Sequence, residues 1–77
     1  MNFNTEYSLS LGDNLHNFYS LLKEEDFDFK TKNIQITISK SDDLLFIKIE
    51  CNSIIDLKIG TTAVQKSLDI IDKTLAF

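Results

Sequence analysis

The sequence has no proline, no arginine and only one cysteine, Cys51. A single cysteine cannot close an internal disulfide or build a zinc site by itself, so we expect a reducing cytoplasm and a small buried apolar role for Cys51. The apolar runs are pairs and triplets, far short of the ~20 residues that span a bilayer. The N-terminus also lacks the basic start and apolar stretch of a secretory signal. These absences predict a soluble cytoplasmic protein that does not contact a membrane.

Positive charge is also scarce, with eight lysines against twelve acidic residues and a formal net charge of -4. Binding of nucleic acid depends on basic side chains that neutralise phosphates. The charge balance therefore argues against a protein that holds nucleic acid unaided. It leaves open membership of a complex whose other members supply the positive charge.

The chain has 77 residues without a linker, a repeat or a low-complexity segment, which predicts a single domain over 1–77. A chain of this size buries only about 60–65% of the surface that its unfolded form exposes. Stabilisation by a partner is therefore expected.

Period-two alternation, which is typical of half-buried strands, occurs in three stretches. The first covers 3–11. The second begins at Phe27 and Phe29 and strengthens over the isoleucines of 34–38, and the third covers 45–51. Each stretch predicts a strand with one apolar and one polar face.

A first helix is expected between the first two strands. Gly12 ends the strand, Asp13 or Asn14 can cap the helix, and apolar residues recur at helical spacing from Leu15. Four consecutive charged residues predict its end within 23–26.

The second and third strands are expected to form a hairpin, because residues 40–43 are turn formers. The outer face of this hairpin is polar except for Phe46, and the edge strands are expected to be short. With a long last helix the order is strand, helix, strand, strand, helix. The sequence therefore predicts an α+β fold, βαββα, in which a three-stranded antiparallel sheet carries both helices on its apolar face.

The last helix is expected over 53–77, capped by Asn52 or by Ser53, which with Asp56 fits a capping box. One stripe is predicted to face the core: Ile54, Leu57, Thr61, Val64, Leu68, Ile71 and Leu75. A neighbouring row of mainly small residues is interpreted as a docking face: Gly60, Ala63, Ser67, Ile70 and Thr74. A polar flank is interpreted as a solvated surface, with a contact surface as the alternative: Lys58, Thr62, Lys66, Asp69 and Lys73.

No set of residues indicates catalysis. His16 is the single histidine and has no cysteine nearby in sequence that would form a nucleophile pair, so a surface role is expected. The acidic residues of 24–28 lack calcium-loop spacing, and Gly60 with its two threonines lacks the second glycine and lysine of a phosphate loop. We predict a protein that is not an enzyme and that uses no metal, cofactor or small-molecule substrate.

The hairpin and last helix resemble the small dimerising subunit of the KEOPS complex, which makes threonylcarbamoyladenosine (t6A) in tRNA. That family is similar in length, in element order and in a strand that ends in a small residue, here Cys51. Its last helix typically carries a leucine-arginine pair, then asparagine-serine, then arginine. Those places are held here by Leu57 and Lys58, by Thr62 and Ala63, and by Lys66. Charge and size partly persist, but the asparagine-serine pair is lost, which favours the divergent archaeal paralogue of that subunit.

The resemblance implies a non-catalytic subunit that forms a heterodimer with the paralogous small subunit, by joining sheet edges, and limits its self-dimerisation. Contact with the KEOPS catalytic subunit, directly or through that paralogue, and indirect contact with tRNA are implied as well. The expected protein interface comprises Leu57, Lys58, Gly60, Thr62, Ala63, Lys66, Ser67 and Ile70.

Three alternatives remain open at the level of sequence. The first alternative is the ordinary homodimerising KEOPS small subunit, which docks on the catalytic subunit. The second is a homodimeric interaction domain unrelated to tRNA. The third is a small RNA-binding module, because such modules also use this element order, although the acidic balance disfavours it.

Overall fold

The computed structural model describes residues 2–25 and 33–75. It contains β1 (Phe3–Ser10), a 3-10 turn η1 (Gly12–Asn14), α1 (Leu15–Glu24), β2 (Gln35–Ser41), β3 (Leu44–Cys51) and α2 (Ile54–Leu75). The predicted α+β fold with the order βαββα is confirmed. Phe27 and Phe29, predicted to begin the second strand, lie outside the described residues.

The sheet is antiparallel and has the order β1-β3-β2, so β3 is its central strand. β2 and β3 form the predicted hairpin, with Ser41 opposite Leu44 and a two-residue turn between them. Asp42 in this turn has φ of 53°, a left-handed conformation that aspartate tolerates better than most residues.

The edge strands β1 and β2 have 8 and 7 residues. The prediction of short edge strands is therefore wrong, since both exceed the average strand of about 5–6 residues.

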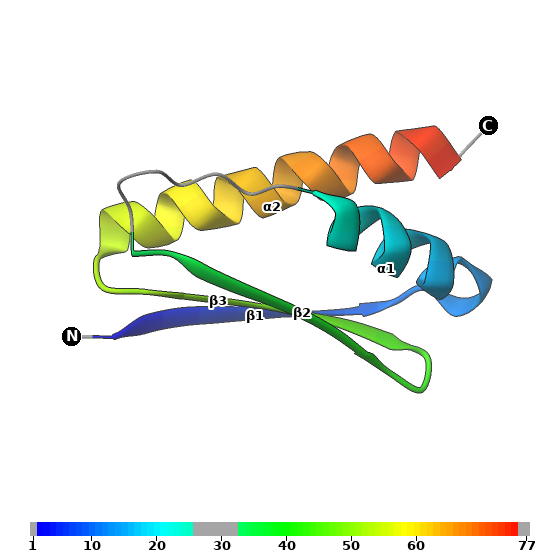
Figure 1. Cartoon of the computed structure of the whole chain (residues 1–77), viewed down its shortest axis with the longest axis horizontal. Helices are drawn as coiled ribbons and strands as arrows, with labels where there is room; N and C mark the ends of the chain where they lie inside the picture. Colours follow the sequence, from blue (N-terminus) through cyan, green and yellow to red (C-terminus); the bar gives the residue numbers. More distant parts are fainter. Residues whose placement is uncertain (1, 26–32, 76–77) are drawn as a thin grey trace.

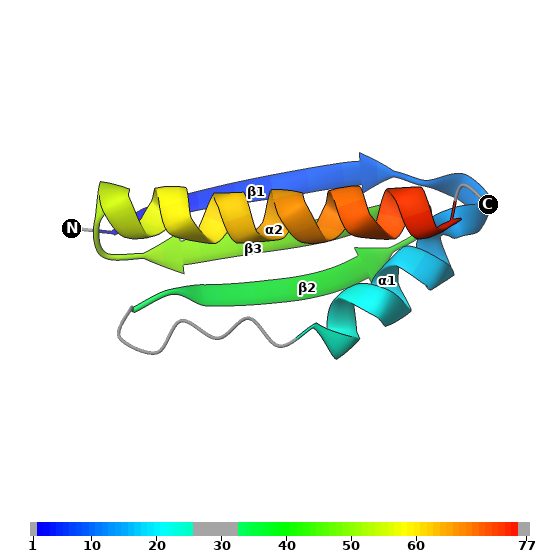
Figure 2. The ribbon, with the colours of Figure 1, turned by 90° about the horizontal axis from the view of Figure 1, so that it is seen from above.

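Both helices cover the same face of the sheet (Figure 1). Seen from the helix side, α2 runs along β1 and β3, whereas α1 lies at the end of β2 (Figure 2). The other face of the sheet is uncovered within the described part of the chain. This face is more apolar than predicted, because Leu44 and Phe46 both alternate with the buried residues of β3 and lie on it.

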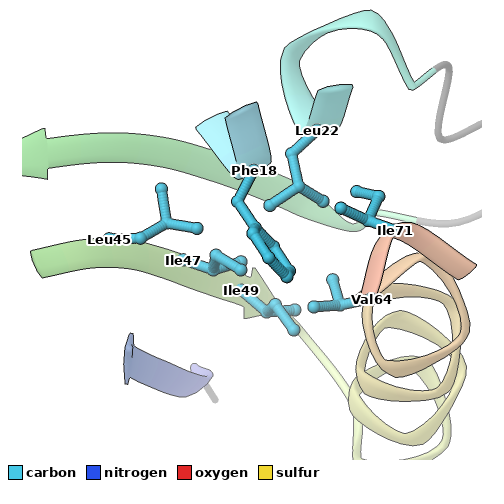
Figure 3. Packing of buried hydrophobic residues seen from close by; sticks show 7 residues of the cluster. All are labelled: Phe18, Leu22, Leu45, Ile47, Ile49, Val64 and Ile71. Carbon is cyan, nitrogen blue, oxygen red and sulfur yellow. The ribbon is translucent and has the colours of Figure 1, made fainter. Parts of the chain in front are cut away.

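The core forms between the central strand and the two helices (Figure 3). The inward side chains of β3 are almost completely buried, and Cys51 at its end is 3% exposed. The predicted buried role of Cys51 is therefore confirmed. The core cluster consists of Phe18, Leu22, Leu45, Ile47, Ile49, Val64 and Ile71.

The two helix starts differ from each other. Ser53 Oγ accepts a hydrogen bond from the Asp56 backbone N–H at 3.1 Å, as the capping-box pattern predicts for Ser53. No side-chain cap precedes α1, because the chain enters it through η1 and Asn14 already has helical φ and ψ. The prediction that Asp13 or Asn14 caps α1 is wrong for this reason, although the predicted end of α1 is confirmed at Glu24.

No helix among the described residues has the length and apolar character needed to cross a membrane.

Candidate docking surface on α2

The sheet-facing side of α2 is set by the four residues of this helix that are buried: Gly60, Val64, Ser67 and Ile71. Leu57, Leu68 and Leu75 pack around them and are partly buried. Ile54 does not belong to this side, because its side chain is 60% exposed at the first residue of the helix. The predicted core stripe is therefore correct for its centre and wrong for Ile54.

Gly60 permits a close approach between α2 and the sheet. A Cβ atom at this position would lie 3.0 Å from Ile49 Cγ2 and 3.2 Å from Ile34 Cγ2. A glycine inside a helix costs about 1 kcal/mol relative to alanine, and here the missing side chain makes room for two isoleucines. The small residue thus serves a contact within the chain.

The predicted docking row needs correction at two positions. Gly60 is buried, and Ser67 is only 8% exposed. Both belong to the buried side of α2, which packs on the rest of the same chain. Neither residue is available on the surface of the chain.

An open groove of about 360 Å³ lies on the outward side of α2. We call it the α2 groove and define it by the five residues that line it: Lys58, Ile59, Thr62, Ala63 and Lys66. Ile59 and Ala63 are half-buried, whereas the two lysines and Thr62 are exposed. Ile55, 71% exposed, precedes Ile59 by one helical turn and extends the apolar surface.

The charge of the groove is positive. Within residues 2–25 and 33–75, neither Lys58 nor Lys66 has an ion-pair partner. Lys73, on the same flank two turns beyond Lys66, instead pairs with Asp69, with 3.0 Å between Nζ and Oδ2. An apolar floor between two unpaired lysines can accept an apolar side chain flanked by carboxylates.

Four residues of the predicted interface are brought together in this groove: Lys58, Thr62, Ala63 and Lys66. Ile70 lies one turn further and is 59% exposed, while Leu57 is partly buried against the core. Sequence reasoning missed Ile55 and Ile59. The four-residue spacing of Ile55, Ile59 and Ala63 is the available signal, but the predicted rows contain only Ala63 of this series.

Two other features lie on the surface outside the α2 groove. A shallow polar hollow of about 560 Å³ at the end of the sheet is lined by Asn2, Asn33, Gln35, Glu50 and Asn52, together with Ile34 and Cys51. Two lysines lie near the ring of Tyr19, with Lys40 Nζ 4.7 Å and Lys23 Nζ 5.6 Å from its centroid. His16 is exposed, and the described residues contain no cluster of three or more histidine, cysteine or acidic side chains suited to a metal ion.

A scan against protein-family models, a search of curated proteins and a search of solved structures each found no match to this chain. Its function is therefore inferred from the sequence pattern and from the geometry of the two helices and the sheet.

Proposed function

We propose that this chain is a non-catalytic subunit of the KEOPS complex for t6A modification of tRNA. In this role it forms a heterodimer with the paralogous small subunit and limits the self-dimerisation of that subunit. The proposal rests on the sequence resemblance, and the geometry described above is compatible with it.

The observation that carries the pairing role is the arrangement of the sheet. The order β1-β3-β2 leaves β1 and β2 with one strand neighbour each within the described residues. Their free backbone N–H and C=O groups form a template for another strand. A related chain with the same fold supplies such a strand, and joining the two sheets stabilises a domain that is small by itself.

The proposal is tested by mixing the purified chain with the paralogous small subunit and measuring mass by size-exclusion chromatography with light scattering. We expect a 1:1 complex that forms at the expense of the homodimer of that subunit. Two separate peaks, with the homodimer unchanged, would contradict the heterodimer.

A second candidate is the ordinary small subunit, which forms a homodimer and docks on the catalytic subunit. The α2 groove favours this candidate, because Lys58, Thr62, Ala63 and Lys66 hold the places of the family motif and are grouped on the outward side of α2. A groove with an apolar floor and lysine rims fits an amphipathic helix with an acidic flank.

Charge reversal separates the two candidates. If the groove docks on the catalytic subunit, Lys66→Glu should lower the affinity at least about tenfold, since it places a like charge against an acidic partner. Lys73→Glu is the matched control, because Lys73 lies on the same exposed flank outside the groove. Affinity is measured by titration of the catalytic subunit in the absence of any paralogue. Equal affinities for both variants and the unsubstituted chain would rule out docking through the groove.

A further inference from the structure

The polar hollow at the end of the sheet has no part in the proposed subunit role, although its volume of about 560 Å³ exceeds that of the α2 groove. We propose that it binds the base of a nucleoside that carries no phosphate, and that Glu50 selects bases with an exocyclic amino group. The inference goes beyond the proposed function, because it concerns a small ligand of the chain alone and requires neither a partner subunit nor tRNA.

The hollow lies on the sheet face that the helices leave uncovered. β1 and β2 begin at the end of the sheet where β3 ends (Figure 2). Gln35 and Glu50 are directly opposite each other in the register of β2 and β3, so both side chains lie on one face. Glu50 alternates with the buried Ile49 and Cys51, which makes this the outer face. Side chains from the ends of all three strands therefore converge on the hollow.

Amide side chains dominate the lining of the hollow. Four of its seven lining residues are asparagine or glutamine: Asn2, Asn33, Gln35 and Asn52. All four are exposed, and none of these side-chain amides forms a hydrogen bond within the described part of the chain. An amide group has an acceptor oxygen and two N–H donors. The hollow therefore offers donors and acceptors together, which suits a ligand whose edge also carries both.

The charge of the hollow disfavours an anionic ligand. Glu50 is the single charged residue among the described residues that line it. Lys48, whose Nζ lies 3.6 Å from Glu50 Oε1, does not belong to the lining. A phosphate group in the hollow would meet a carboxylate without a cation of its own beside it. An uncharged nucleoside is therefore favoured over a nucleotide or a nucleic acid strand.

A nucleobase matches the side chains that are present. Asparagine and glutamine pair bidentately with adenine N6 and N7, and a glutamate carboxylate accepts a hydrogen bond from the N4 amino group of cytosine. The half-buried Ile34 adds an apolar contact for the flat face of a ring. The volume of the hollow also lies within the range of about 300–1,000 Å³ that is common for small-molecule sites.

Cytidine and uridine are matched probes of the site, because cytosine carries an amino group where uracil carries the carbonyl oxygen O4. The Glu50 carboxylate accepts a hydrogen bond from that amino group and repels the carbonyl oxygen. We expect cytidine to bind at least about tenfold more tightly than uridine. Nuclear magnetic resonance titration of the full chain measures both affinities. Saturating shifts are expected at the backbone amides of residues 33, 35, 50 and 52.

A pair of variants tests the role of Glu50. Glu50→Gln should abolish the preference for cytidine, because a glutamine amide both donates and accepts. Glu6→Gln is the matched control, since Glu6 lies opposite Lys48 on the same outer face but outside the hollow. It should retain the preference. The amide spectrum of each variant shows directly whether the chain is folded.

Three results would overturn the proposal. The absence of saturating shifts with cytidine, or equal affinities for cytidine and uridine, would exclude selection of an amino-bearing base. Tighter binding of cytidine monophosphate than of cytidine would show that the hollow recognises a phosphate. Equal binding of ribose alone would assign the hollow to a sugar. None of these results bears on the heterodimer, which is judged separately by mixing with the paralogous subunit.

Discussion

The two sides of α2 use small residues for different purposes. Gly60 and Ser67 are both buried, and the absence of a side chain at Gly60 lets the helix approach the strands closely. On the outward side, Thr62 and Ala63 line the α2 groove together with Lys58, Ile59 and Lys66. A small side chain in an amphipathic helix therefore does not by itself indicate a surface for a partner. Burial decides which of the two purposes it serves.

The largest effect is expected from the same substitution at a buried and at an exposed residue of α2. Ile71→Ala should lower the free energy of unfolding by about 3 kcal/mol, since it leaves a cavity beside the core cluster. Ile70→Ala, at the neighbouring residue, should change it by about 0.5 kcal/mol or less. Ile71 is 3% exposed and Ile70 is 59% exposed. Urea denaturation at a fixed protein concentration measures both, and similar losses would show that the two sides of the helix are not distinct.

An intermediate effect is expected at Gly60. Gly60→Ala places a Cβ atom 3.0 Å from Cγ2 of the fully buried Ile49. Overpacking of about 2 kcal/mol exceeds the helix-propensity gain of about 1 kcal/mol, so a net loss of about 1 kcal/mol is expected.

Thr62→Ala is the control for that substitution, because Thr62 is exposed on the outward side and the change tests propensity alone. It should leave the free energy of unfolding unchanged or raise it by up to about 0.5 kcal/mol. Thermal and urea unfolding of the two variants provide the measurement. A Gly60→Ala variant more stable than the original chain would mean that the packing between α2 and β3 accommodates a Cβ atom at residue 60 without overpacking.

The smallest effect is expected at the start of α2, which belongs to neither side. Ser53→Ala removes the hydrogen bond to the Asp56 N–H and should cost about 0.5 to 1 kcal/mol. Asn52→Ala, at the exposed residue just before it, should cost less than about 0.5 kcal/mol. Helicity and urea midpoints compare the two variants. Equal losses would indicate that the cap is shared between the two residues.

Much of the fold could be predicted because its signals are local. The alternation of Leu45, Ile47 and Ile49 defines a strand with one buried face, and all three are fully buried. The candidate docking surface was predicted only in part. Lys58 and Lys66 were predicted as interface residues because they hold places of the motif of the family that the chain resembles, whereas Ile59 belongs to neither the predicted core stripe nor the predicted docking row.

Other features depend on which elements become neighbours. The contact between Lys40 and Tyr19 follows from the register that sets Lys40 opposite Leu45 and from the position of Tyr19 in α1. From the sequence alone, Lys40 belongs to the turn-forming residues 40–43. No local rule indicates that its charge faces the helices, because strand pairing and helix packing are set by contacts between distant residues.

The sequence by itself determined the element order, the hairpin, a helix cap at Asn52 or Ser53 and the existence of an amphipathic last helix, since each follows from the spacing of a few adjacent residues. Only the tertiary structure decided the rotation of α2 about its axis. Residues four positions apart differ by only about 40° around the helix axis. Apolar residues at three- and four-residue steps are therefore compatible with more than one rotation of the helix toward the core. The close approach at Gly60 to Ile49 selected one of them, which turned Gly60 and Ser67 inward and left Ile55 and Ile70 outside.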